Sequence, residues 1–316
     1  MAETKRLFTG LQPSGQLHIG NYFGALKPTV ELFKNHEGLI MVADYHSLTS
    51  LKDGPALREN IVEIVRAYLA AGIDPERATI FKQSDVPEHT ELAWIFNCLV
   101  TVAFLELGHA YKDKVAKGLE ANAGLLTYPM LMAADILLYD TDVVPVGEDQ
   151  RQHVEYAREA AAKFNNAFGQ TFKEPQEMIQ KAVGIIPGTD GKKMSKSYGN
   201  TIPLFGTKDE IAKAVMSIVT DSDGGLPKNV YEIHKLFRPD SLTQLEAVYE
   251  KYQGNYKALK EMLVDDIESI IAPMREKRDS ITDEQVREVL NKGAEKAKAI
   301  ASAKMEDVRK KVGVSI

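Results

Sequence analysis

The chain has 316 residues, 44% of them hydrophobic, and a formal net charge of −6. This length suggests two domains with full cores, and the acidic balance argues against a protein that coats nucleic acid, although a local basic patch stays compatible with it. The single cysteine, Cys98, excludes a disulfide framework and a cysteine-based zinc site, and we expect it to be packed. The N-terminus has no signal-peptide core and no run reaches transmembrane length, which predicts a soluble cytoplasmic protein.

The first half of the chain alternates strand and helix signals. Short apolar runs at 6–10, 39–43, 78–81 and 143–146 predict buried strands, and helical patterns are found at 20–33, 57–71, 87–103, 129–139 and 149–164. Repeated βα units predict an α/β fold with a Rossmann-like, doubly wound parallel sheet over residues 1–205, with a helical insertion around 104–125. In such a sheet, ligands bind beyond the carboxyl ends of the strands.

Residues 13–21 (PSGQLHIGN) form the first strand-to-helix junction. Pro13 and Gly15 are turn residues, and the helix that follows presents unpaired N–H groups to an anion. His18 and Asn21 could donate hydrogen bonds to phosphate oxygens, and Gly20 leaves room for a flat base. The alternative is an ordinary βα turn with a surface histidine.

Residues 188–200 form a lysine-rich segment with glycines at 188, 191 and 199. The glycines predict a mobile loop. Three lysines at 192, 193 and 196 give the charge density that a triphosphate needs, and a loop can close as charge develops on the transferring phosphate. The alternative is a solvated basic surface loop.

After Phe205 strand signals are nearly absent. Sequences typical of capping boxes begin at Thr207, Ser241 and Thr282, and residues 292–312 form a basic amphipathic helix. We therefore predict an all-helical C-terminal domain over residues 206–316. The lysines of the last helix, Lys296 and Lys298 among them, fit either nucleic-acid phosphates or a solvated face.

Residues 13–21 and 193–197 (KMSKS) resemble the HIGH and KMSKS motifs of class I aminoacyl-tRNA synthetases. Together with the run from Leu125 to Glu155, they resemble the bacterial tryptophanyl-tRNA synthetases over essentially the whole chain. The resemblance implies a homodimer that activates L-tryptophan with ATP and Mg²⁺ and then esterifies tRNA(Trp), with an anticodon-binding helical domain. The tyrosyl-tRNA synthetases share the fold and both motifs, so the residues of the amino-acid pocket must separate the two families.

The resemblance also implies an ATP site built from both motifs. Lys193, Lys196, His18 and Lys114 would supply catalytic charge, and Asp149 would accept the ribose hydroxyls. No metal cage of protein ligands is expected, because Mg²⁺ is commonly bound by phosphate oxygens and water. The residues implied to contact ATP are Gln12, Pro13, Ser14, Gly20, Asn21, Gly147, Glu148, Asp149, Ile186, Lys193, Met194, Ser195, Lys196 and Ser197.

Asp135 lies in an otherwise apolar helical run, where a buried carboxylate is costly unless its oxygens are hydrogen-bonded. The matching aspartate of the resembled family accepts the indole N–H, and the alternative is a carboxylate that caps neighbouring backbone. The remaining tryptophan-binding residues implied by the resemblance are Phe8, Met132, Val144 and Val146 as apolar walls, Tyr128 and Gln150 around the α-amino group, and His46 near the substrate.

Two other classes of protein compete with this interpretation. A small-molecule nucleotidylyltransferase uses a similar turn on the same fold, but it would need neither the helical second domain nor the run from Asp135 to Gln150. A non-catalytic tRNA-binding or regulatory relative would be expected to lack His18, Lys193 or Lys196, and all three are present.

Overall fold

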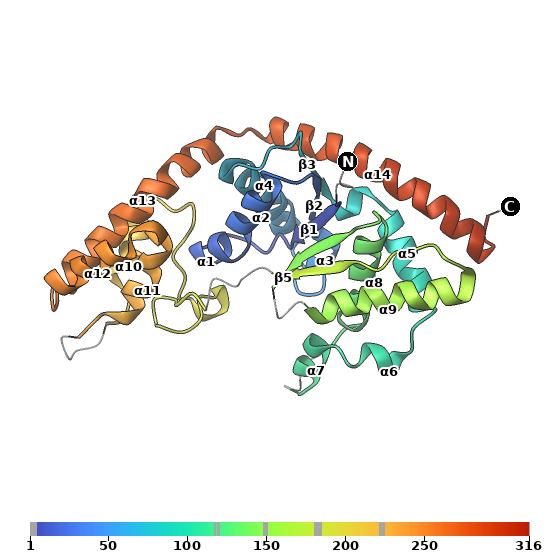
Figure 1. Ribbon diagram of the computed structural model, residues 1–316, viewed down its shortest axis with the longest axis horizontal. Helices are drawn as coiled ribbons and strands as arrows, with labels where there is room; N and C mark the ends of the chain where they lie inside the picture. Colours follow the sequence, from blue (N-terminus) through green and yellow to red (C-terminus); the bar gives the residue numbers. More distant parts are fainter. Residues whose placement is uncertain are drawn as a thin grey trace.

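The computed structural model describes residues 5–116, 118, 121–147, 151–179, 185–220 and 225–315 (Figure 1). Five parallel strands form one sheet in the order β3-β2-β1-β4-β5. They are β1 (Leu7–Leu11), β2 (Gly38–Val42), β3 (Ala78–Lys82), β4 (Val143–Val146) and β5 (Gln176–Ile179). The strand order reverses between β1 and β4, which confirms the doubly wound sheet and places its ligand-binding crevice at that pair.

Helices cover both faces of the sheet. One layer contains α1 (Ile19–Asn21), a π-helical turn (Tyr22–Leu26), α2 (Lys27–Phe33) and α4 (Gly54–Ala71). The other contains α5 (Glu88–Asn97), α8 (Ala123–Leu137) and α9 (Arg151–Phe168). The short helix α3 (Asp44–Ser47) follows β2, and a 3₁₀ turn (Gln83–Asp85) follows β3. Helices α6 (Val102–Leu105) and α7 (His109–Ala116) lie in the predicted insertion.

Neighbouring residues of the inner strands enter different cores. Leu7 of β1 packs with the α2–α4 layer, whereas Phe8 packs with the α5–α8–α9 layer. In β2, Ile40 and Met41 divide in the same way. Because both faces are buried, the strands read as continuous apolar runs, which is why the sequence identified them.

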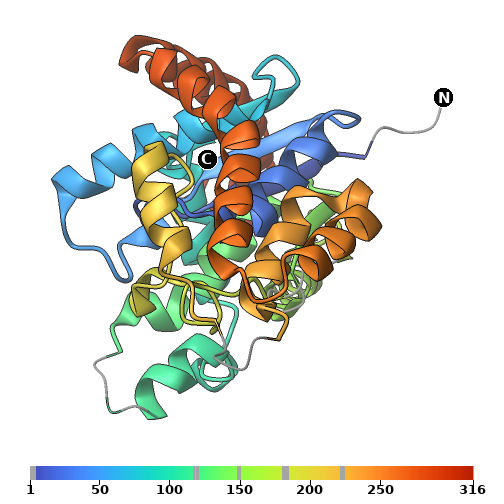
Figure 2. The ribbon, with the colours of Figure 1, turned by 90° about the vertical axis from the view of Figure 1, so that its left-hand side faces the viewer.

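The C-terminal region begins with four helices, α10 (Lys208–Met216), α11 (Lys228–Phe237), α12 (Leu242–Lys251) and α13 (Tyr256–Ser280). Figure 2 views the molecule from their side. Their apolar residues continue the core of the α2–α4 layer. Thr207 and Thr282 form the predicted capping boxes, but Ser241 makes no side-chain cap bond because it ends a 3₁₀ turn (Pro239–Ser241) instead of starting from extended backbone.

The last helix, α14 (Asp283–Val312), starts earlier than predicted and leaves the other C-terminal helices to run along β3 (Figure 1). Its first half joins the core of the α2–α4 layer through Leu290, and its second half joins the opposite core through Met305. It therefore covers the edge strand of the sheet, which would otherwise expose unpaired backbone groups. The predicted boundary at residue 206 stays a prediction, but α14 packs on the first domain.

Two basic residues of α14 serve this packing. Lys304 pairs with Asp140 at 2.6 Å, and the Arg309 guanidinium pairs with Glu91. Lys296 and Lys298 lie on the exposed face of the helix. The basic stripe predicted from the sequence therefore divides into residues that hold the helix in place and residues that face solvent.

Other differences from the sequence analysis have local causes. Helix α8 begins at Ala123 because Asn122 caps it, so Pro129 lies inside the helix. The predicted helix 87–103 is divided at Thr101, whose side chain caps α6. Cys98 is exposed, contrary to the packed position expected. The edge strand β5 escaped prediction because it is short and largely solvent-facing. No described helix is long and apolar enough to cross a bilayer.

Gly293 marks the point where α14 crosses β3 most closely. A Cβ atom at this position would overlap the carbonyl oxygen of Ile80. We expect Gly293→Ala to lower the free energy of unfolding by at least about 2 kcal/mol, because backbone cannot yield as a side chain does. Thermal or denaturant unfolding would measure it.

The control is Ala299→Gly, at an exposed position of the same helix, which should cost only about 1 kcal/mol through helix propensity. A Gly293→Ala variant as stable as the parent would show that the helix can move away from β3 without loss.

Candidate functional site

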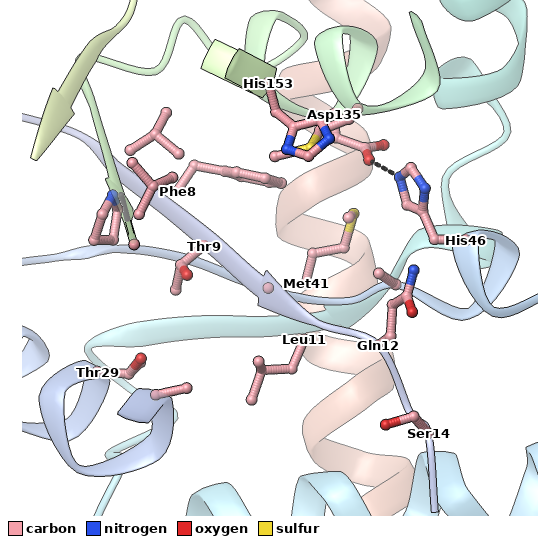
Figure 3. A pocket seen from close by; sticks show the side chains of 18 of the residues that line it. Phe8, Thr9, Leu11, Gln12, Ser14, Thr29, Met41, His46, Asp135 and His153 are labelled. Atoms are coloured by element: carbon pink, nitrogen blue, oxygen red, sulfur yellow. Dashed lines mark hydrogen bonds and ion pairs between the residues drawn. The ribbon is translucent and has the colours of Figure 1, made fainter. Parts of the chain in front are cut away.

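A cavity of about 710 Å³ lies at the carboxyl ends of the strands around β1 and β4. Each described residue predicted for the amino-acid pocket lines it (Figure 3). These residues are Phe8, His46, Tyr128, Met132, Asp135, Val144 and Val146. Gln150 lies outside the described residues.

Part of the predicted ATP site lines the same cavity, namely Gln12, Ser14, Asn21 and Gly147. Pro13, Gly20, Ile186 and residues 193–197 are not among its lining residues. Glu148 and Asp149 lie outside the described residues. Lys114 belongs to α7, and its side chain lies outside the described part of the chain.

Strand β1 divides the cavity into two lobes, as Figure 3 shows. Phe8, His46 and Asp135 lie on one side of the strand, and Thr9, Leu11 and Thr29 lie on the other. The division follows from the two-residue period of a strand, which sends neighbouring side chains to opposite faces. One lobe is bounded by apolar walls and a carboxylate, and the other lies beside the helix that follows the first motif.

Asp135 is only 1% exposed, and its carboxylate is surrounded by polar side chains. His46 Nε2 lies 2.8 Å from Oδ2, Gln83 Nε2 donates to both oxygens at 2.8 and 3.0 Å, and His89 Nδ1 lies 2.6 Å from Oδ1. Burial alone would raise the pKa of this carboxyl, but His89 and His46 outweigh burial and hold it at about 2. The partners of the Asp135 carboxylate among the described residues are side chains, so Asp135 is an ionised acceptor and not a backbone cap.

Tyr128 and His153 meet across the cavity from α8 and α9. The Tyr128 hydroxyl lies 2.6 Å from His153 Nε2, and both residues line the cavity. Burial raises the pKa of the Tyr128 hydroxyl, so it stays protonated at neutral pH and can act as a donor or an acceptor.

The two motifs are held together by backbone pairing. Ile19 N–H donates to the Ile202 carbonyl at 3.0 Å, and Leu204 N–H donates to the Leu17 carbonyl at 2.9 Å. Lys196 Nζ donates to the Ser14 carbonyl at 2.8 Å. The lysine loop therefore lies against the strand-to-helix junction, and Lys196 is a loop lysine that touches it.

The loop itself folds around Asn200. Its side-chain oxygen accepts from Ser195 N–H at 2.8 Å, and its amide donates to Asp190 at 2.6 Å. Gly191 and Gly199 adopt positive φ angles of 79° and 63°, which only glycine reaches without strain. Met194 is buried and pairs with Ile186 through its backbone N–H. The glycines expected to make the loop mobile thus form its tight turns here.

His18 lies at the start of α1, packed over Gly20, where a Cβ would meet its ring at 2.9 Å. Burial, and then the positive charge of Lys196, lower its pKa from 6.5 to about 4. Its Nδ1 atom is buried and has no hydrogen-bond partner among the described residues. Asn21 Oδ1 accepts from the His18 backbone N–H at 3.1 Å, which leaves the Asn21 amide as a donor.

The amino-acid sequence places the chain among known proteins. Residues 2–291 match the family described as class I tRNA synthetases (W and Y). The tryptophan–tRNA ligase of Fusobacterium nucleatum is 49% identical, with 98% of each chain covered, and that of Campylobacter jejuni is 44% identical over 98% of this chain and 100% of its own. This chain belongs to the tryptophan–tRNA ligase family.

The same assignment follows from solved structures. The Campylobacter jejuni tryptophanyl-tRNA synthetase in complex with ADP and tryptophan superposes with a TM-score of 0.91 at 44% identity, covering 98% of this chain and 99% of that one. This chain and the Campylobacter jejuni enzyme therefore share the sheet and the C-terminal helices of class I tryptophan–tRNA ligases.

Several cavity residues of this family member escaped the sequence analysis. Thr9, Met41 and Thr29 line the cavity, and so does His153. Met41 lies one residue before the end of β2 and could have been found from the rule that ligands bind at strand ends. His153 stood in the run quoted from the sequence, but its partner, Tyr128, is 25 residues away and only the fold brings them together.

His18 should be neutral throughout the physiological range. The pKa of His18 is about 4 in the folded protein and 6.5 in its ordinary state, so the unfolded chain binds a proton at His18 more readily than the folded protein does. The contribution of neutral His18 to the free energy of unfolding is therefore complete above about pH 6.5 and is lost as the pH falls toward 4. Imidazole NMR should show the titration near pH 4. Lys196→Ala should raise this pKa while leaving it below 6.5, because burial is the larger cause.

Lys192→Ala is the matched control, because it removes an equal charge from an exposed part of the loop. This variant should leave the pKa of His18 unchanged. A parent protein whose His18 titrates at 6.5 would contradict the buried, neutral histidine.

Proposed function

We propose that this chain condenses L-tryptophan with ATP to form tryptophanyl-adenylate and transfers the aminoacyl group to tRNA(Trp), with release of AMP and pyrophosphate. The observation that carries the proposal is one cavity that joins a buried carboxylate in an apolar lobe to the strand-to-helix junction touched by Lys196. The Campylobacter jejuni relative, solved in complex with ADP and tryptophan, supports it.

The apolar lobe is proposed to hold the indole ring. Phe8, Met132 and Val144 line it, and the ionised Asp135 would accept the indole N–H. A phenylalanine side chain would leave that carboxylate without the donor, and sites built for such a bond reject the analogue strongly. Tyr128 and Gln150 would hold the α-ammonium group, with His153 fixing the Tyr128 hydroxyl.

The second lobe is proposed to hold ATP. The N-terminus of the helix that begins at Ile19 faces an anion favourably, and Asn21 retains an amide donor. The neutral His18 can donate one ring N–H to a phosphate oxygen. The adenine would lie against Gly20 and the Ile186 backbone, and Asp149 would accept the ribose hydroxyls.

The reaction needs no protein nucleophile. A carboxylate oxygen of tryptophan attacks the α-phosphorus, the bond from that phosphorus to the bridging oxygen breaks in line, and pyrophosphate leaves with the bonding electrons. The protein contributes orientation and positive charge. Lys193 and Lys196, with Lys114 from the insertion, would neutralise the α-phosphate and the leaving pyrophosphate. The transfer step then joins the aminoacyl group to a ribose hydroxyl of the tRNA terminus.

Mg²⁺ is proposed to arrive with the nucleotide. Within the described residues, no group of three or more histidine, cysteine or acidic side chains could hold a metal ion. The hydrogen-bond donors near the first motif, such as the Asn21 amide, suit phosphate oxygens. Phosphate oxygens and water molecules are in turn the ligands that Mg²⁺ commonly takes. When bound, the ion would neutralise phosphate charge alongside the lysines.

We also propose that the enzyme works as a cytoplasmic homodimer whose C-terminal helices contact tRNA. Apolar side chains are exposed on and beside α5 and α6, where Trp94 is 70%, Val102 61% and Leu107 51% accessible. The proposed dimer contact would cover these side chains, since exposed apolar patches are typical of protein contacts. The exposed Lys296 and Lys298 of α14 offer charge for tRNA phosphates.

ATP–pyrophosphate exchange tests the activity directly. Tryptophan should support exchange and tyrosine should not, and Asp135→Ala should raise the tryptophan KM by about a hundredfold while compressing the preference for tryptophan over phenylalanine. Asp209→Ala, an exposed aspartate of α10, is the control. Exchange stimulated equally by tyrosine would refute the proposed substrate.

Charging of tRNA(Trp) tests the role of α14. Replacing Lys296 and Lys298 with glutamine should weaken charging at low salt, with a loss relative to the parent that shrinks as the salt concentration rises, and leave the exchange reaction within about twofold. Glutamine at Lys34 and Lys52, which are exposed on the first domain, removes the same charge as a control. Equal loss in both reactions would mean that the outer face of α14 supports the fold and does not contact tRNA.

A further inference from the structure

His89 contacts the Asp135 carboxylate from the side away from the cavity. His46 lines the cavity, whereas His89 is completely buried in α5 and is absent from the lining. Its Nδ1 atom lies 2.6 Å from Asp135 Oδ1. Both oxygens of the carboxylate therefore have partners behind the cavity or at its wall, which fixes the plane of the carboxylate before a ligand arrives.

Tyr139 contacts the other ring nitrogen of His89. The Tyr139 hydroxyl lies 2.7 Å from His89 Nε2, and Tyr139 is also completely buried. A phenol that donates to Nε2 leaves the ring proton of a neutral His89 on Nδ1, which lies 2.6 Å from Asp135 Oδ1 in an ion-pair contact that is not an aligned hydrogen bond. The other neutral tautomer would set a nitrogen lone pair against an ionised oxygen. The two neutral tautomers of His89 are therefore not equivalent beside Asp135.

Tyr139 also supports the opposite wall of the amino-acid lobe. Its ring stacks on Phe8 with centroids 5.7 Å apart and planes at 15°, and Phe8 lines the cavity. Tyr139 therefore contacts both Phe8, which lines the amino-acid lobe, and His89, which lies against the Asp135 carboxylate.

Helix α14 contacts the chain next to His89 and next to Tyr139. Ser302 Oγ donates to Glu88, the neighbour of His89, at 2.6 Å. Lys304 pairs at 2.6 Å with Asp140, the neighbour of Tyr139. Asp140 has a φ of 48°, a left-handed conformation that is uncommon outside glycine and is found where surrounding contacts impose it. The backbone on each side is thereby fixed.

We propose that His89, oriented by Tyr139, is a positioning residue that holds the Asp135 carboxylate in place for the indole N–H and so sets the discrimination against amino acids that lack this donor. The proposal rests on the proposed function, in which Asp135 accepts the indole N–H. If His89 served only to neutralise a buried charge, its loss would weaken folding and affect every substrate equally.

The test compares His89→Asn with His89→Gln. An asparagine amide nitrogen falls near the position of Nδ1 and can still donate to Asp135, whereas a glutamine amide falls near Nε2 and reaches toward Tyr139. Exchange kinetics are measured with tryptophan and with its benzothiophene analogue, in which sulfur replaces the N–H. The ATP KM and the melting temperature are measured for each variant.

We expect His89→Gln to raise the tryptophan KM by about tenfold or more and to leave the ATP KM unchanged. The same variant should reduce the preference for tryptophan over the sulfur analogue by a similar factor. His89→Asn should restore both values to within about threefold of the parent. The proposal is overturned if the two variants behave alike, or if His89→Gln changes both substrates by one factor.

Tyr139→Phe keeps the stack on Phe8 and removes only the hydroxyl, so it serves if a substitution at His89 does not fold. It should also reduce the preference for the N–H donor, and an unchanged preference would overturn the role of His89 and Tyr139. Asp135→Asn is run in parallel. If that variant still prefers tryptophan over the sulfur analogue as the parent does, the indole assignment in the proposed function fails, whatever the result at His89.

Discussion

The site depends on the side-chain alternation of one strand. Strand β1 is paired on both edges, with β2 and with β4, so its side chains can point only to the two helical layers. Phe8 faces one lobe of the cavity and Thr9 the other. An amino acid and a nucleotide placed in these lobes would meet at the carboxyl end of the strand, where Gln12 and Ser14 lead into the first motif. Their proximity is a consequence of the sheet.

Charge is distributed to match this division. The apolar lobe contains one ionised carboxylate, whose low pKa is maintained by His89 and His46 against the opposing effect of burial, and Gln83 donates to it. The other lobe borders a neutral histidine and a lysine that already reaches the Ser14 carbonyl. Each lobe therefore has the electrostatic character opposite to the group proposed for it, an N–H donor in one case and a triphosphate in the other.

Helix α14 links the C-terminal helices to the far edge of the sheet. It follows α13 of the C-terminal helices, covers the edge strand β3, and ends against α5. The contacts of Ser302 and Lys304 place it directly behind the residues that surround Asp135. A helix that follows the proposed tRNA-binding helices in the chain thus packs behind the proposed tryptophan lobe.

The amino-acid sequence by itself determined the features that local rules govern. The buried strands, the glycine turn at 13–21, the capping boxes at Thr207 and Thr282, and the separation of a sheet from a helical region all follow from periodicity and turn chemistry. The apolar setting of Asp135 also marked it from the sequence as a carboxylate that must have partners. Where a local rule failed, as at Ser241, a preceding 3₁₀ turn had already fixed the backbone.

Only the tertiary structure decided which partners Asp135 has. His46, Gln83 and His89 are separated from it by 89, 52 and 46 residues, and no periodicity relates positions that far apart. The course of α14 was undetermined for the same reason, because its helical pattern fixes an apolar stripe but not the surface that the stripe covers. Local sequence sets backbone conformation and which side chains share a face. The identity of the groups that meet is set by long-range packing, since the free energy of burial depends on the total area removed from water and not on chain separation.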